Sequence, residues 1–146
     1  MSVRKQFATF WADGLYFGVE VDQVQEVIRH QEMTRVPLAP SVVRGLINLR
    51  GHIVTALDLR RRLELRERPQ GQLPMNVVIR TEDGPVSLLV DEIGDVVEAD
   101  DDTFEAPPDT LDSKVRHMIR GVHKLKDQLM HVLDSQTVIQ ISGAAK

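Results

Sequence analysis

The sequence predicts an all-β fold in which two similar small barrels carry a few short helices. Three observations lead to this prediction. Short apolar segments are punctuated by glycine and proline, helical stripes are few and short, and one order of segments occurs twice along the chain. Short strands with regular turn signals are typical of small barrels.

Three strand pairs are expected around glycine turns. Apolar runs flank Asp13-Gly14 in the first 20 residues, and the same device recurs at Asp83-Gly84 and at Arg50-Gly51. Glycine adopts the positive φ that a tight hairpin turn requires. The sequence therefore predicts hairpins over residues 7–19, 46–57 and 77–90.

Helical signals are weaker than the strand signals. A single turn is predicted over Pro40–Val43, because proline suits the start of a helix. A short helix is predicted over Leu59–Arg68, which Pro69 would end. A further apolar stripe of helical spacing runs from Leu111 to Val122.

The chain also resembles itself. Gly45–Asp58 matches Gly121–Asp134 at a spacing of 76 residues, and Val21–Ile28 matches Val90–Val97. These matches divide a single domain, residues 1–146, into approximate repeats 6–68 and 75–141, with exchange of strands between the two left open. A barrel this small is marginal alone, so the two are expected to pack together and leave a groove at their seam. Asp58 and Asp134 recur in both copies, which suggests that each caps a following helical turn.

The composition excludes several classes of function. The 146 residues carry a net charge of −4 and no cysteine, which excludes a disulfide scaffold and thiol chemistry and disfavours general nucleic-acid binding. No apolar run approaches the roughly 20 residues of a spanning helix, and the first residues lack a signal-peptide core, so a soluble cytoplasmic protein without membrane insertion is expected.

Catalytic and metal motifs are missing from the sequence. There is no Gly-x-Ser-x-Gly, no Gly-x-x-x-x-Gly-Lys and no Gly-x-Gly-x-x-Gly, so we expect no enzyme and no cofactor. The histidines do not have the spacing of a metal set, and solvated or strand-edge positions are expected for all of them. They are His30, His52, His117, His123 and His131.

One basic cluster remains, between Arg60 and Arg68, and it is interrupted by Glu64 and Glu67. Its simplest interpretation is a solvated helix face. The alternatives are a surface for an acidic protein partner or a patch that binds RNA. The RNA alternative is weakened because few aromatic side chains are free to act as stacking platforms.

The segment Gly45–Arg60, which reads GLINLRGHIVTALDLR, resembles the signature of the CheW family of chemotaxis adaptors. Val24–Ile28 and Val90–Ile93 are similar to other anchor segments of that family, and the resemblance extends from Phe7 to Ile139. It implies two five-stranded SH3-like barrels related by a pseudo-twofold axis.

The resemblance also implies a function. A CheW-like protein is a non-catalytic adaptor that couples the cytoplasmic tips of methyl-accepting chemoreceptors to the histidine kinase CheA, through the CheW-like regulatory domain of that kinase. Other CheW-like modules are further candidate partners, and the location implied is the cytoplasm beside membrane-bound receptor arrays. The competing functions are a small-barrel RNA-binding protein that uses the Arg60–Arg68 patch and, more weakly, a small-ligand enzyme.

Seven residues fall where family members line or support the receptor-facing groove, whereas no kinase-facing residue is assigned. The seven are Val24, Glu26, Gly45, Arg50, Gly51, Ile93 and Val96. The planar guanidinium of Arg50 is expected to form a bidentate pair with a carboxylate, for which Glu26 is the candidate. Val24 and Ile93 occupy equivalent positions in the two copies, so they would either be core residues or meet a receptor helix at the seam.

Overall fold

The structure is a computed structural model that describes residues 3–141, so both ends of the expected domain, residues 1–2 and 142–146, lie outside the described residues. The chain is mainly β, as predicted. Its strands are β1 (Arg4–Ala12), β2 (Leu15–Glu20), β3 (Val24–Ile28), β4 (Val43–Leu49), β5 (His52–Asp58), β6 (Met75–Ile79), β7 (Val86–Val90), β8 (Glu92–Asp100), β9 (Phe104–Glu105), β10 (Ile119–Lys124) and β11 (Leu129–Leu133). The helices are α1 (Leu59–Arg62), α2 (Ser113–Met118) and α3 (Ser135–Ile139), with 3-10 turns η1 (Val21–Gln23) and η2 (Asp101–Thr103).

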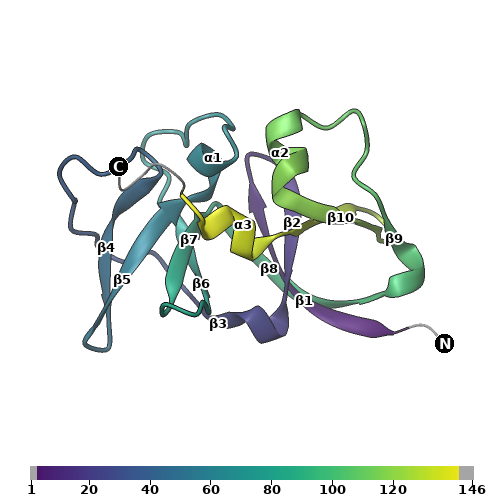
Figure 1. Cartoon of the computed structure of the whole chain (residues 1–146), viewed down its shortest axis with the longest axis horizontal. Helices are drawn as coiled ribbons and strands as arrows, with labels where there is room; N and C mark the ends of the chain where they lie inside the picture. The colour runs from purple at the N-terminus through teal and green to yellow at the C-terminus, as the bar shows by residue number, and fades with distance from the viewer. Residues whose placement is uncertain (1–2, 142–146) are drawn as a thin grey trace.

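Two sheets curl into two barrels that lie side by side (Figure 1). The six-stranded barrel has the strand order β8-β1-β2-β11-β10-β9, and the five-stranded barrel has the order β3-β6-β7-β5-β4. Each barrel takes strands from both halves of the chain. Replacing β8, β1, β2, β11 and β10 by β3, β6, β7, β5 and β4 converts one order into the other, which is the pseudo-twofold relation that the family resemblance implied.

The barrels differ by one strand, whereas five strands were expected in each. The two-residue strand β9 extends the six-stranded sheet beside β10. At the corresponding edge of the other sheet, Thr34 makes only an isolated bridge to Leu46 in β4. Gly121 in β10 permits the extra strand, because a Cβ there would clash with the carbonyl oxygen of Glu105.

Two of the predicted hairpins have the tight turns expected. Asp13 and Gly14 have φ of 51° and 80°, and Arg50 and Gly51 have φ of 52° and 89°. Positive φ at both central residues is the signature of a type I′ turn, whose twist matches that of the flanking strands. The third predicted hairpin, β6–β7, has a longer connection over residues 80–85, in which Gly84 has a φ of 105°.

The barrels share a central apolar core, here called the seam. It takes buried side chains from both sheets and from all three helices, among them Phe10, Phe17, Ile79, Leu88 and Val138. Alternate residues of a strand face opposite sides of a sheet, so neighbours of the seam residues fill the barrel interiors. Val78 and Leu89 do so in the five-stranded barrel, and Met130 does so in the six-stranded barrel. Helix α3 lies between the two barrels in Figure 1.

Two helical predictions need correction. The helix predicted over Leu59–Arg68 ends at Arg62, because Glu64 adopts a φ of 57° and the amide of Leu65 donates to the Arg60 carbonyl, as in a Schellman C-cap. The stripe predicted to run from Leu111 to Val122 is helical only over α2. Its last member belongs to β10, where strand pairing with β11 prevails over the helical spacing.

The single turn predicted at Pro40–Val43 is present, and it does not continue into a helix. The amide of Val43 donates to the Pro40 carbonyl at 2.9 Å, and the chain then enters β4 directly. Extended pairing of β4 with β5 therefore begins where a second helical turn would otherwise form. The two aspartates predicted to cap helical turns do so: Asp58 accepts the amide of Arg60, and Asp134 accepts that of Thr137.

Candidate functional site

The candidate site is built around an ion pair that closes the five-stranded barrel. Arg50 stands in the β4–β5 turn, and its Nη1 and Nη2 donate to Oε2 and Oε1 of Glu26 in β3, both at 2.7 Å. Strands β3 and β4 are the opposite edges of this sheet, so only the curl of the barrel brings the two residues together. The predicted bidentate pair is therefore present.

The local backbone holds the Arg50 turn in place. The Oδ1 atom of Asn48 accepts the amide of Gly51 at 2.9 Å, which fixes the turn from within. The Arg50 side chain is 75% exposed, whereas that of Glu26 is 17% exposed. The hydrogen bond from Arg50 lowers the pKa of Glu26 against the opposing effect of burial, so the carboxylate stays ionised and keeps the turn oriented.

Val24 and Ile93 occupy matching places in the two barrels. Val24 in β3 pairs with Ile79 of β6, and Ile93 in β8 pairs with Phe10 of β1. Both side chains are half-buried against the seam. Each of them packs on the core and still presents part of its surface.

Three residues farther along the same strands, two valines are exposed. Val96 in β8 is 59% exposed, and Val27 in β3 is 39% exposed. The predicted site includes Val96 but omits Val27, although the match between Val21–Ile28 and Val90–Val97 makes the two equivalent. Strands β3 and β8 thus each present one half-buried and one exposed apolar side chain beside a barrel edge.

Gly45 does not lie beside the Arg50 turn. It stands five residues earlier in β4, a separation of roughly 16 Å along a strand. A Cβ at this position would lie 2.7 Å from the Thr34 carbonyl oxygen, so glycine lets the incoming loop pack on β4. Its contribution to the site is to place the loop that follows β3.

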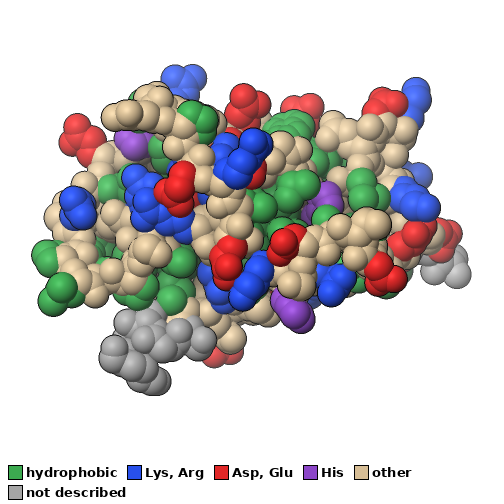
Figure 2. All heavy atoms as spheres, turned by 90° about the horizontal axis from the view of Figure 1, so that it is seen from above, with side chains coloured by type: hydrophobic (Ala, Val, Ile, Leu, Met, Phe, Trp, Pro, Cys, Tyr) green, Lys and Arg blue, Asp and Glu red, His purple; other side chains and the backbone are tan. Residues whose placement is uncertain are grey.

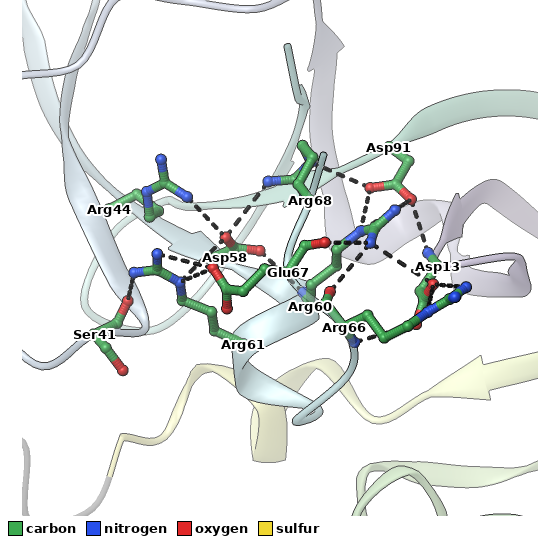
Figure 3. Close-up of polar contacts among 10 residues, drawn as sticks. All are labelled: Asp13, Ser41, Arg44, Asp58, Arg60, Arg61, Arg66, Glu67, Arg68 and Asp91. Atoms are coloured by element: carbon green, nitrogen blue, oxygen red, sulfur yellow. Dashed lines mark hydrogen bonds and ion pairs between the residues drawn. The ribbon is translucent and has the colours of Figure 1, made fainter. Parts of the chain in front are cut away.

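A second polar cluster, missed at the level of sequence, joins the two barrels (Figure 3). Arg60 in α1 donates from Nη2 to Asp91 Oδ2 at 2.6 Å and from Nε to Asp91 Oδ1 at 2.9 Å. Asp91 also accepts the amide of Asp13, which lies in the β1–β2 turn of the other barrel. Arg66 in turn pairs with Asp13 at 2.8 Å.

The same cluster extends to Asp58 (Figure 3). Three guanidinium groups lie within 4 Å of this carboxylate, those of Arg44 at 3.1 Å, Arg68 at 3.4 Å and Arg61 at 3.8 Å. Arg68 also reaches Asp91 at 3.2 Å. Asp13, Asp58 and Asp91 were noticed in the sequence only as turn and repeat positions, because nothing local reveals partners that lie up to 78 residues away.

The prediction of a solvated helix face at Arg60–Arg68 is therefore wrong for its first and last members. The side chains of Arg60 and Arg68 are 8% and 5% exposed, and Arg62 donates to two carbonyl groups of α3 and to that of Gln140 just after it. Figure 2 shows the face above α1 and α2, where basic and acidic side chains lie next to one another. Arginines committed to internal carboxylates and carbonyls give no support to the RNA-binding alternative.

Two histidines also depart from expectation. His123 and His131 are buried in β10 and β11 rather than solvated. The Nδ1 of His123 lies 2.8 Å from the Thr103 hydroxyl, its ring packs on Phe7 and Phe104, and burial lowers its pKa. Within residues 3–141, no three His, Asp or Glu side chains are arranged to hold a metal ion. No helix in this range has the length and apolarity to cross a membrane.

Known proteins are similar to this chain in sequence and in fold. The CheW-like domain family matches residues 6–142. The chemotaxis protein CheW of Bacillus subtilis is 28% identical over 135 residues, which cover 92% of this chain and 86% of that protein. CheW of Treponema pallidum is 27% identical over 88% of this chain and 78% of its own length.

A solved structure has the same fold. The scaffolding protein TtCheW of Thermoanaerobacter tengcongensis superposes with a TM-score of 0.84 at 24% identity, over 97% of this chain and 96% of that one. The two curled sheets, the pseudo-twofold strand order and a family match over nearly the whole chain lead to one conclusion: this protein belongs to the CheW-like domain family.

Proposed function

We propose that this protein is a non-catalytic chemotaxis adaptor that couples the cytoplasmic tips of methyl-accepting chemoreceptors to the histidine kinase CheA. The family match over residues 6–142 is the observation that carries the proposal. The fold supports it, because two barrels joined by a shared core present several separate surfaces. An adaptor needs only such binding surfaces and no catalytic residues, since its function is to bind two partners at once.

The receptor-facing surface would lie along β3, β8 and the β4–β5 turn. A receptor tip is helical, and a helix binds a groove through apolar anchors spaced along one face. Val24 and Ile93 at the seam and Val96 on β8 supply such contacts. Exposed ion pairs add little stability, so the Arg50–Glu26 pair would act by holding the turn in one geometry.

The kinase would bind elsewhere through its own CheW-like regulatory domain. Because the two barrels of this chain are similar but not identical, a contact with a homologous module can be head to tail, and such contacts close into rings or extend into arrays. The protein would then be located in the cytoplasm beside membrane-bound receptors. Further CheW-like modules would be able to join the same assembly.

Reconstitution tests the receptor-facing surface. Receptor-containing membranes, kinase and this chain are mixed, and the bound fraction of the chain is measured by co-sedimentation. The Arg50→Ala and Arg50→Lys variants should bind at least about tenfold more weakly than wild type, because neither keeps the bidentate pair. Arg120→Ala is the matched control, since Arg120 pairs with Glu20 in the other barrel and is 48% exposed. Binding of both Arg50 variants at the wild-type level would overturn this assignment.

A further inference from the structure

A cavity of about 270 Å³ opens into the interior of the six-stranded barrel. It lies beside η2 and β9, at the end of the molecule away from the five-stranded barrel (Figure 1). None of the seven predicted receptor-facing residues lines it. The mouth of a β-barrel is a common place for a small-molecule site, so the chemistry of this lining can be asked to select a ligand.

Three rings line the cavity. Phe7 of β1 and Phe104 of β9 both pack on the ring of His123 in β10, at centroid distances of 5.4 Å and 5.1 Å. Phe7 and Val132 belong to the buried interior of this barrel, whereas Phe104 is exposed. Walls of this kind favour an aromatic ligand, because rings gain from edge-to-face and offset contacts with one another.

His123 occupies a position that the other barrel fills with an apolar side chain. The sequence match at a spacing of 76 residues makes Ile47 its equivalent, and their strand partners, Met130 and Val54, are equivalent as well. Ile47 is buried in the five-stranded barrel, and His123 is only 2% exposed. Burial of a polar ring costs free energy unless its nitrogens find partners, so the fold alone does not account for a histidine here.

Hydrogen bonds assign the proton on the His123 ring. The Thr103 hydroxyl donates its only hydrogen to the Asp100 carbonyl at 2.9 Å, and its oxygen lies 2.8 Å from Nδ1 of His123. The hydroxyl oxygen therefore accepts from the ring, and Nδ1 carries the proton. Burial lowers the pKa of His123, so the ring is neutral at about pH 7 and Nε2 keeps its lone pair.

This lone pair has no partner within residues 3–141. The bond at Nδ1 is the one hydrogen bond that the ring makes there, and the ring itself lines the cavity. A buried acceptor without a partner is costly, so a ligand that donates a hydrogen bond to Nε2 is favoured over one that does not. A hydroxyl or an N–H group on the ligand would supply this donor.

The charges in the described lining balance one another. Lys5 and Arg120 are positive, Glu20 and Asp101 are negative, and Arg120 pairs with Glu20 at 3.6 Å. A ligand with a net charge would gain little attraction from this set and would lose hydration on entering. The volume suits one substituted aromatic ring, since an apolar cavity of about 150 Å³ is enough to bind benzene.

We propose that this cavity binds a small neutral aromatic molecule that carries a hydroxyl or N–H group, with that group donating to Nε2 of His123 and the ring packed against Phe7 and Phe104. The proposal is independent of the adaptor function, because it uses no receptor-facing residue and needs no second protein. It gives the six-stranded barrel a ligand acceptor that Ile47 does not supply at the equivalent place in the five-stranded barrel.

Phenol and toluene test the proposal on the wild-type chain. The two probes are similar in size and toluene loses less hydration, so tighter binding of phenol requires a hydrogen bond inside the cavity. Titrations followed by heteronuclear NMR should show phenol binding at least about tenfold more tightly than toluene. The shifts should fall at the amides of β9 and β10 and at Nε2 of His123. Benzoate, which is charged, should bind more weakly than phenol.

His123→Phe keeps an aromatic ring but removes the lone pair, so it should lose the preference for phenol over toluene. His131→Phe is the matched control, because His131 is also buried, lies in the neighbouring strand β11 and does not line the cavity. It should keep the preference, and thermal melting checks that both variants fold. The wild-type comparison decides the matter alone if either variant does not fold.

Three results with the wild-type chain would overturn the proposal. They are an absence of phenol binding, which would mean that the cavity holds only water, binding of toluene at least as tight as that of phenol, and binding of benzoate tighter than that of phenol. Loss of the preference for phenol in both folded variants would also overturn it, since the lone pair of His123 would then not be the acceptor.

Discussion

The chain crosses between its barrels at two equivalent places that are held by different chemistry. At the β7–β8 crossing, Asp91 is buried among Arg60, Arg68 and the amide of Asp13. At the β2–β3 crossing, the equivalent Asp22 is exposed and has no side-chain partner among the described residues.

The helices beside these crossings also differ in how they connect the two barrels. Helices α1 and α3 are both capped by an aspartate, so the local backbone plan is the same. Beside α1 the connection between barrels is made by ion pairs between side chains. Beside α3 it is made by hydrogen bonds, from Ser135 Oγ to Gln23 Oε1 at 2.6 Å and from the Arg62 guanidinium to backbone carbonyls of α3.

One backbone symmetry thus accommodates two kinds of attachment. A neutral hydrogen bond contributes modestly to the free energy of unfolding. Its loss costs little where each group can form a hydrogen bond with water instead. Removal of one member of a buried ionic cluster is strongly destabilising, because the remaining charges stay buried without a partner of opposite charge. We therefore expect the two crossings to respond very differently to matched substitutions.

The largest effect should come from removing the central carboxylate. Asp91→Ala should lower the free energy of unfolding by about 3–5 kcal/mol, since the buried Arg60 guanidinium would be left without its main partner. Asp22→Ala at the equivalent position should change it by less than about 0.5 kcal/mol. Urea unfolding followed by circular dichroism measures both variants. Equal losses at the two positions would mean that the ionic cluster does not distinguish the crossings.

A smaller effect is expected from acid. Burial alone would raise the pKa of Asp91, but hydrogen bonds from Arg60 and from the Asp13 amide lower it overall, and the hydrogen bond from Arg66 lowers the pKa of Asp13. Below the ordinary value of 3.8 the unfolded chain binds protons that the folded chain does not, so the free energy of unfolding falls as the pH falls.

Substitution separates the contribution of Asp91 to this pH dependence from that of the other carboxylates. In Asp91→Asn the slope of unfolding free energy against pH should be shallower below pH 3.8 than in wild type, and Asp22→Asn serves as the control. Equilibrium denaturation in a series of buffers gives the slopes. An unchanged slope in Asp91→Asn would show that other carboxylates account for acid sensitivity.

Local chemistry explains which parts of the fold could be predicted. Asp13-Gly14 and Arg50-Gly51 revealed their turns, because positive φ at two successive residues has a strong sequence signature. The end of α1 was missed, because a Schellman cap usually contains glycine and here Glu64 takes that place. The strand course of Val122 was missed because apolar spacing alone does not reveal pairing with β11.

The candidate site was predictable to the extent that the family resemblance placed its residues. The pair between Arg50 and Glu26 followed from the chemistry of a guanidinium beside a turn and a carboxylate in an anchor segment. The inward use of Arg60 and Arg68 did not follow, because their partners lie in segments that meet them only after both barrels have formed. A run of charged residues is predicted to be solvated as long as its partners in the folded structure are unknown.

A charge exchange across Glu26 and Arg50 tests the adaptor account most directly. Binding to receptor-containing membranes with kinase is measured for Glu26→Arg, for Arg50→Glu and for the double variant, with thermal melting as a check of folding. The account predicts that each single variant loses binding and that the double variant recovers a large part of it, because the pair is rebuilt with its charges reversed. Single variants that bind as tightly as wild type would contradict it.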